Sequence, residues 1–403
     1  MRLNKETYIK SQEEINNLFV EQVRNGRQSI TLGPGVFSCG QFLGYLDSNQ
    51  KGLHGTAAAL RVLSAFPQIN QDLINGLISY VVNFNDIEND TPDKDIDYNN
   101  VIKKSELLYS FSFIRGGTAD CSELIRKYSR ELIDSRIQDR AWSFFTNNNA
   151  EEADILPTSY ATLALAANNF PEAGVGCLFL KNQIEEITKE RFKDPETFAK
   201  VILALYVLIF SEKHSLKGDD RKKYKSILNK IWNSEYALMR NDTEQNVEYP
   251  YNTKHYYVRI PWQLYLMAIS NELSYRYTSK VTYCDRLTSL IKQLANGGFK
   301  YLQSGKYTSS RTNAIAFDIL DHLKEKERNT ISVFILNMYD RFKNFLRKKW
   351  VKWIINIIGI AIAGYSILLY SQNNTQMLLD LAPELIGSLV IYLVLFNLKS
   401  EKN

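Results

Sequence analysis

The sequence predicts an all-α protein, in which an array of repeated helix pairs is followed by a C-terminal apolar hairpin. One observation behind this prediction is a type of segment, rich in alanine, leucine and aromatic residues, that recurs along most of the chain. A second is that each such segment follows a polar or Gly/Pro-containing lead-in, as the start of a helix often does. The third is a pair of long apolar stretches near the C-terminus.

The clearest of the recurring segments is 155–166, which follows the aromatic lead-in Trp142-Ser143-Phe144-Phe145. Pro157 lies near the start of the segment, where the fixed φ and missing N–H of proline suit the first turn of a helix. The residues behind Pro157 are small and apolar, the composition of a helix that packs on most of its surface. Five further segments share this build, namely 53–60, 104–111, 194–199, 259–265 and 310–317.

The recurring segments are regularly spaced. From His54 through Pro157 and Pro261 to Asn313 the spacing is roughly fifty residues per unit, and only Pro195 falls early. A period of roughly 20–50 residues is typical of repeat arrays, whose units are each too small to bury their own apolar face. Because roughly fifty residues hold two helices and two connections, six units give about twelve helices.

Two motifs resemble those of a known superfamily. The run Pro157–Leu163 resembles the Pro-Thr-Tyr-Ala helix of protein prenyltransferase β subunits and squalene cyclases, and Gly297-Gly298-Phe299 resembles their Gly-Gly-Phe lead-in. The resemblance covers about residues 35–325. It implies a terpenoid cyclase/prenyltransferase-like α/α toroid, with inner helices ringed by outer ones around a central cavity. The alternative is an open, HEAT-like solenoid.

Four regions are expected along the chain. The helical segment at the N-terminus has an apolar stripe that includes Ile15, Phe19 and Val23. The regions are this segment at 1–34, the toroid at 35–328, a basic amphipathic interfacial helix at 329–349 and a transmembrane hairpin at 350–403.

Composition narrows the class of protein. The net charge of +5 is too mild to indicate nucleic-acid binding. The four cysteines lack CxxC spacing, which favours reduced thiols over a disulfide framework. The first residues contain no apolar stretch, so we expect no signal peptide, and the abundance of Asn, Ile and Lys suggests an AT-rich bacterial genome.

The last part of the chain has the pattern of a membrane hairpin. The expected spans are 354–370 and 377–398, with Trp350 and Trp353 at the interface. Lysines and arginines lie before the first span and after the second, which predicts the bacterial inner membrane, with the toroid and both termini cytoplasmic. The alternative is a buried soluble hairpin.

Two carboxylates fall within the second span. Asp380 and Glu384 lie four residues apart and hence on one helix face. Carboxylates inside a membrane are costly and indicate function, so they could line a polar path in an oligomer. The alternative, which we leave open, is that the membrane begins near Leu385 and both acids lie at the interface.

The catalytic motifs of the similar families are missing. Squalene cyclases use an Asp-x-Asp-Asp acid, which this chain lacks, and Asp120-Cys121-Ser122-Glu123 matches the Asp-Cys-Thr-Ala-Glu of the oxidosqualene type only in part. Prenyltransferases hold zinc with an Asp, a Cys and a His, but this chain has Arg259-Ile260-Pro261-Trp262 and Asn313 at the corresponding places. We therefore expect no metal and no cofactor, and leave enzymatic activity uncertain, leaning against it.

The starts of the expected inner helices offer a different set of residues. If the geometry of the superfamily holds, they point to the mouth of a cavity. Their cations, together with helix N-termini, favour an anionic ligand such as a phosphate, a nucleotide or a pyrophosphate. The candidates are His54, Tyr160, Lys254, His255, Arg259, Trp262, Arg311 and Asn313.

Two functional hypotheses follow. The first is a non-enzymatic membrane effector of bacterial anti-phage type, whose toroid senses an anionic ligand or a partner protein and whose hairpin oligomerises to disrupt the bilayer. The second is a membrane-bound terpenoid cyclase/prenyltransferase-like enzyme acting on an isoprenoid lipid. The missing catalytic motifs favour the first, which rests on architectural analogy. Its partners would be the lipid bilayer, the ligand and further copies of the chain, with no direct nucleic-acid binding.

Overall fold

The computed structural model divides the chain into two compact units, Met1–Thr330 and Ile331–Asn403. The structure describes residues 5–29, 53–87, 100–114, 119–138, 140–145, 152–211, 218–238, 244–251, 254–273, 283–300 and 308–325. The expected interfacial helix at 329–349 and both expected spans lie outside the described residues. So do the four hairpin residues singled out above, Trp350, Trp353, Asp380 and Glu384.

The described part of the chain is mainly helical, which confirms the expected all-α class. Its only strands form one antiparallel hairpin of β1 (Gln245–Tyr251) and β2 (Lys254–Ile260). The helices are α1 (Lys5–Ser29), α2 (Leu53–Leu63), α3 (Pro67–Ile87), α5 (Val101–Phe111), α6 (Ala119–Asp134), α7 (Ile155–Ala167), α8 (Ala173–Ile187), α9 (Pro195–Ser211), α10 (Gly218–Asn233), α11 (Glu235–Leu238), α12 (Trp262–Glu272), α13 (Tyr283–Ala295) and α14 (Ser310–Glu325).

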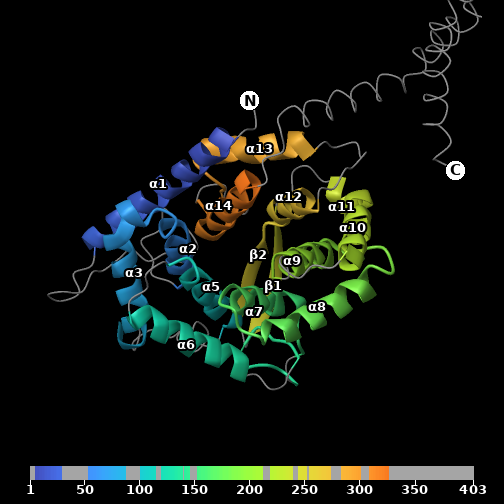
Figure 1. Ribbon diagram of the computed structural model, residues 1–403, viewed down its shortest axis with the longest axis horizontal. Helices are drawn as coiled ribbons and strands as arrows, with labels where there is room; N and C mark the ends of the chain where they lie inside the picture. The colour runs from blue at the N-terminus through green and yellow to red at the C-terminus, as the bar shows by residue number, and fades with distance from the viewer. Residues whose placement is uncertain are drawn as a thin grey trace, which may run out of the picture. The chain divides into compact units, whose positions relative to one another are not determined.

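Six helices coincide with the six recurring segments of the sequence. They are α2, α5, α7, α9, α12 and α14. Each contacts the next, from α2 through to α14, and α14 in turn contacts α2, so that the series of contacts closes (Figure 1). The helix α9 illustrates why these elements lie inside: every residue from Val201 to Ile209 is buried, as expected for a helix that is apolar on all sides.

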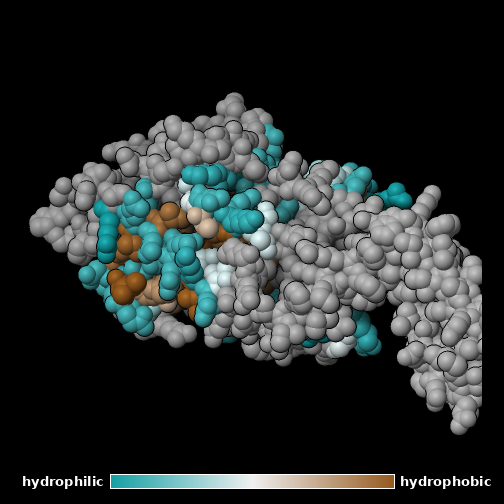
Figure 2. All heavy atoms as spheres, turned by 90° about the horizontal axis from the view of Figure 1, so that it is seen from above, coloured by the Kyte–Doolittle hydropathy of each residue, from teal (hydrophilic) through white to brown (hydrophobic). Residues whose placement is uncertain are grey.

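The remaining long helices lie around this series in Figure 1. Their contacts agree: α3 packs on α2, α6 on α5, α8 on α7 and α9, and α10 on α9, while α1 packs on α14 and α2. These helices are more amphipathic; α6, for example, buries Leu124, Tyr128 and Leu132 between charged residues. Figure 2 shows hydrophilic and hydrophobic side chains side by side on one face of the molecule.

Polar side chains fix where the inner helices begin. Asn100 caps α5 by accepting hydrogen bonds from the backbone N–H groups of Ile102 and Lys103, at 2.9 and 3.2 Å. Asp154 caps α7 and Asp194 caps α9, each accepting from a backbone N–H of the first turn at 2.7 Å. Such caps satisfy N–H groups that the helix itself leaves without partners, and each contributes about 1 kcal/mol.

The aromatic lead-in to α7 is fully buried. The indole N–H of Trp142 donates to the carbonyl of Leu132 at 2.7 Å, and its backbone N–H donates to the Thr158 hydroxyl at 3.1 Å. Phe144 lies at a T-shaped angle to Phe145 and stacks on Tyr249 of β1, with the centroids of the stacked rings 4.2 Å apart. This lead-in therefore joins the end of α6, the start of α7 and the hairpin.

The hairpin itself was not predicted. Its inward-facing residues include Val247, Val258 and Ile260, all buried, and the hairpin packs against α9. Part of the signal was present in the alternation of residues along 247–251 and 258–260, which has the period of two that is typical of a strand. The expected start of an inner helix at Arg259 is in fact the end of β2, and α12 begins at Trp262.

The predicted cellular location, the bacterial inner membrane, must be corrected. A span needs roughly 20 consecutive apolar residues, and no helix in the described part of the chain is both long and apolar enough to cross a bilayer. The 25-residue α1, the longest of those helices, carries charged side chains along its length. This finding contradicts the prediction of a bacterial inner-membrane protein with the toroid and termini cytoplasmic, and we do not retain it.

Candidate functional site

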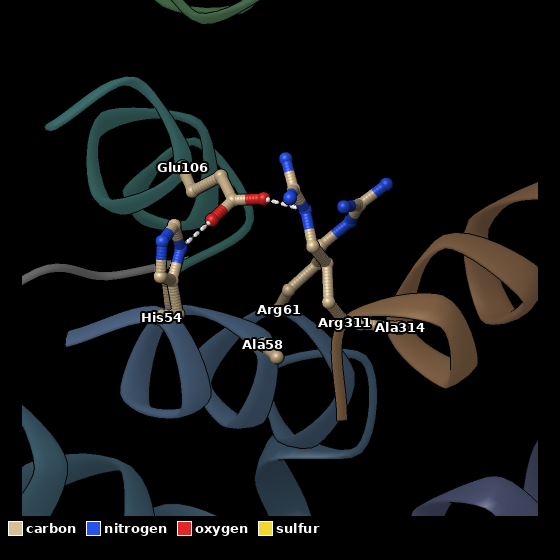
Figure 3. Close-up of a pocket in the computed structure, with 7 residues that line it drawn as sticks. His54, Ala58, Arg61, Glu106, Arg311 and Ala314 are labelled. Carbon is tan, nitrogen blue, oxygen red and sulfur yellow. Dashed lines mark hydrogen bonds and ion pairs between the residues drawn. The ribbon is translucent and has the colours of Figure 1, made fainter. Parts of the chain in front are cut away.

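A pocket lies where the first and last inner helices meet. It is lined by His54, Ala57, Ala58 and Arg61 from α2, Glu106 from α5, and Arg311 and Ala314 from α14 (Figure 3). The ≈ 230 Å³ of empty space between these residues includes space open to solvent, and the centre of a water-sized sphere can occupy only ≈ 10 Å³ of it, which is about the room for one water molecule. A larger group can enter only when the surrounding side chains move apart.

Glu106 bridges two of the predicted site residues. Its Oε1 lies 2.6 Å from Arg311 Nε, and its Oε2 contacts His54 Nδ1. The three side chains are 10%, 14% and 22% exposed, respectively, so the pairs are largely shielded but reachable from solvent. The bridge ties α5 to both α2 and α14, three helices that are far apart in sequence.

The second arginine of the pocket has a similar environment. Arg61 pairs with Asp318 of α14, and the Tyr109 hydroxyl also donates to that carboxylate at 3.3 Å. The guanidinium of Arg61 lies 4.7 Å from the centroid of the Tyr109 ring, and that of Arg311 lies 4.7 Å from the Tyr160 ring. Figure 3 shows the two guanidiniums side by side. Stacking on aromatic rings holds both guanidinium groups in place.

The pKa shifts in the pocket have clear causes. Burial would raise the pKa of Glu106, but the charges of Arg311 and His54 outweigh it and lower that pKa to about 2. The pKa of His54 is lowered, mainly by burial, although Glu106 acts in the opposite direction. At neutral pH the pocket therefore holds an ionised Glu106 beside a neutral imidazole.

Two nitrogens of Arg311, Nε and Nη2, are buried without a well-aligned hydrogen bond among the described residues. Nε lies 2.6 Å from the Glu106 carboxylate, so Nη2 is the nitrogen that lacks a charged partner there. Arg311 stacks over the ring of Tyr160, whose hydroxyl is also buried without a well-aligned hydrogen bond among the described residues. This hydroxyl nevertheless interacts with Arg311 and Tyr265. A buried donor left unpaired costs roughly 1–3 kcal/mol, so a group that accepts from Nη2 would be stabilised at this place.

Other predicted site residues have structural roles. The Asn313 side chain donates to the carbonyls of Phe299 and Ser309, at 3.2 and 2.6 Å, and accepts from the Phe299 N–H at 3.1 Å. It thereby clamps the turn at Gly297 and Gly298, which have φ of 92° and 83°. Trp262 is 3% exposed and packs edge-on against Phe198 in the core.

Arg259 belongs to a separate cluster, which we call the bracket: Glu244, Arg259, Ser309 and Thr312. Arg259 Nη1 lies 2.7 Å from Glu244 Oε2, and the Thr312 hydroxyl donates to Glu244 Oε1 at 2.6 Å. Burial raises the pKa of Glu244, and the favourable charge of Arg259 and the Thr312 hydrogen bond only partly offset it. The side chains of Arg259 and Glu244 are 7% and 2% exposed, so this pair is closed to solvent.

The structure thus brings together three of the eight predicted cavity residues, His54, Tyr160 and Arg311. For Lys254 and His255 the structure gives only the backbone, in β2 opposite Tyr251 and Pro250. Sequence reasoning missed Glu106, Arg61 and Asp318. Arg61 is a charged residue among the apolar residues of α2, a pattern that could have identified it, whereas Glu106 and Asp318 lie in helices that carry several other charges.

The described residues contain no group of three or more His, Cys, Asp or Glu side chains that could hold a metal ion. Comparison with protein-family models, with curated proteins and with solved structures gives no match for this chain. The site must therefore be interpreted from its own geometry.

Proposed function

We propose that Met1–Thr330 is a non-enzymatic sensor that binds a small anionic group in the pocket between α2, α5 and α14. The observation that carries the proposal is the buried Nη2 of Arg311, a charged donor without a well-aligned hydrogen bond in the described part of the chain. Guanidinium forks match phosphate and carboxylate oxygens, and charge-assisted hydrogen bonds are about twice as strong as neutral ones.

We also propose that this unit is an α/α toroid similar in architecture to terpenoid cyclases and protein prenyltransferases. The closed series of contacts from α2 to α14 and back to α2 supports a toroid over a solenoid, because the ends of an open solenoid do not meet. In such a ring the pocket lies at the closure, so a bound anion would link its first and last helices.

We infer that the sensor is the input part of a bacterial anti-phage type effector that acts as a homo-oligomer, on the strength of architectural analogy. The pocket gives no support to an enzyme acting on an isoprenoid lipid, because four of its seven lining residues are ionisable.

Isothermal titration calorimetry with inorganic phosphate tests the sensor. Arg311→Gln should weaken binding roughly tenfold to a hundredfold, the equivalent of one charge-assisted hydrogen bond. Ala58→Leu, which fills the pocket without changing its charge, should weaken binding as well. The matched control is Lys189→Gln, which removes a cation from an exposed ion pair on α8 and the following turn and should leave binding unchanged.

Loss of Arg311 also leaves Glu106 without its cation, so stability must be controlled. The double variant Glu106→Gln/Arg311→Gln keeps the charges balanced and should fold while failing to bind phosphate. Binding that persists in both Ala58→Leu and the double variant would remove the anion site from this pocket.

A further inference from the structure

The charges of the pocket cancel before any ligand enters. Arg61 is paired with Asp318, and Arg311 with Glu106. His54 is the remaining ionisable residue of the pocket lining. An anion that enters therefore brings uncompensated negative charge into a partly buried space, which is costly unless a positive charge appears with it.

His54 is placed to supply that charge. Its ring contacts Glu106 of α5, and the other charged groups that act on it are Lys103 of α5 and Arg311 of α14. Its side chain is 22% exposed, so a proton can reach it from solvent. A negative charge within about 4–6 Å raises the pKa of a histidine by roughly 1–3 units.

We propose that the ligand group is a doubly charged tetrahedral oxyanion of phosphate or sulfate size, and that it binds together with one proton taken up by His54. This inference rests on the proposed function. The guanidiniums of Arg61 and Arg311 lie side by side, and the Glu106 carboxylate lies between Arg311 and His54 (Figure 3). The free space among them is about that of one water molecule, so the oxyanion enters as these side chains move apart, with a protonated His54 and the two guanidiniums as its donors.

The proton linkage gives the affinity a definite pH dependence. In the free protein the pKa of His54 is below its usual value, and the bound dianion raises it. Between these two pKa values, each fall of one pH unit should strengthen binding by up to about tenfold. Above the pKa of the complex the gain is lost, because His54 then stays neutral in both states.

Calorimetry with inorganic sulfate in two buffers of different ionisation enthalpy, at one pH near neutral, measures the proton directly. Sulfate is the probe because it does not titrate there, whereas a phosphate monoester has a second pKa of about 6. The full chain should take up close to one proton per sulfate. His54→Gln should bind more weakly and take up none, and acetate, a single negative charge, should bind more weakly than sulfate.

The outcomes separate the two proposals. Sulfate binding that depends on Arg311 but takes up no proton would overturn the proton linkage and leave the anion site standing. Acetate binding as tightly as sulfate would overturn the dianion assignment. Binding of neither anion nor of phosphate would overturn the proposed function itself. If His54→Gln fails to fold, the two-buffer comparison on the unmodified chain still decides the question.

Adenosine 5′-monophosphate and inorganic phosphate distinguish the source of the oxyanion. Tighter binding of the nucleotide would identify a phosphate monoester as the ligand, with the rest of the molecule outside the pocket. Equal binding would identify the free ion. In both cases Ala58→Leu should weaken the interaction, and a nucleotide that binds Ala58→Leu normally would contradict a role of the pocket.

Discussion

The pocket and the bracket use the same chemistry for different ends. Each pairs a glutamate with an arginine, and each lies at the start of α14, where Arg311 and Thr312 are neighbours in sequence. In the bracket, both Glu244 oxygens have partners and the pair is closed to solvent. In the pocket, Arg311 keeps a buried donor without a partner, and space remains beside it.

The two glutamates show the difference most clearly. The pKa of Glu106 falls to about 2 and that of Glu244 rises. The charges of Arg311, His54 and Arg61 outweigh the burial of Glu106, whereas Arg259, the Thr312 hydroxyl and Arg311 do not fully offset the loss of hydration of Glu244, whose side chain is less exposed, at 2% against 10%. The comparison teaches that an arginine at a helix start indicates a ligand only when its donors are not all satisfied by the protein.

The largest expected effect is on the bracket. Arg259→Met leaves a buried Glu244 without its cation and should lower the free energy of unfolding by about 3–5 kcal/mol. Urea denaturation measures this change, and phosphate binding should not change. The charge-balanced variant Glu244→Gln/Arg259→Met should recover most of the loss. If Arg259→Met instead abolished phosphate binding at full stability, the bracket would be part of the ligand site.

Acid titration should separate the two glutamates. Ionised Glu106 stabilises the fold by about 3 kcal/mol above its unfolded pKa of 4.5, and this contribution is lost as the pH falls to about 2. Glu106→Gln should therefore be less sensitive to acid in that range. Glu244 has a raised pKa, so it costs stability as the pH rises through its folded pKa, and Glu244→Gln should remove that cost. Chemical denaturation from pH 2 to 7 tests both signs.

Two neighbouring glycines, Gly297 and Gly298, test whether the Asn313 side chain holds the turn. Both Gly297 and Gly298 have positive φ, so alanine at either should cost about 1–3 kcal/mol of backbone strain. A Cβ at Gly298 would also lie 2.6 Å from Asn313 Oδ1, which accepts the Phe299 N–H, whereas at Gly297 no atom lies within 4 Å. Gly298→Ala should thus lower the melting temperature more than Gly297→Ala. Equal losses would show that Asn313 does not clamp the turn.

The smallest expected effects compare two neighbouring hydroxyls on α14. The Thr312 hydroxyl donates to Glu244, so Thr312→Val should cost about 1–3 kcal/mol. The Ser310 hydroxyl is buried without a hydrogen-bond partner among the described residues, so Ser310→Ala should be neutral or slightly stabilising. Thermal unfolding of the two variants tests the contrast, and a large loss in Ser310→Ala would mean that its hydroxyl has a partner.

Much of the helical framework follows from the sequence alone. The starts of α2, α5, α7, α9 and α14 coincide with or adjoin segments marked by proline, by polar caps or by runs of alanine and leucine, and these signals act within one or two turns. The N-terminal segment at 1–34 was likewise expected to be helical, and α1 covers Lys5–Ser29. Local signals succeeded here because helix starts depend on neighbours in the chain.

The partners of the charged residues were decided by the tertiary structure. Arg61 and Asp318 are 257 positions apart, and His54 and Glu106 are 52 apart. No local pattern shows which carboxylate pairs with Arg259 or Arg311, or which arginine keeps a donor without a partner. The answer depends on how α2, α5 and α14 meet. The sequence determined which segments become inner helices. The closing of the helix series determined which of their charged side chains have a partner, because a partner must lie within hydrogen-bond distance.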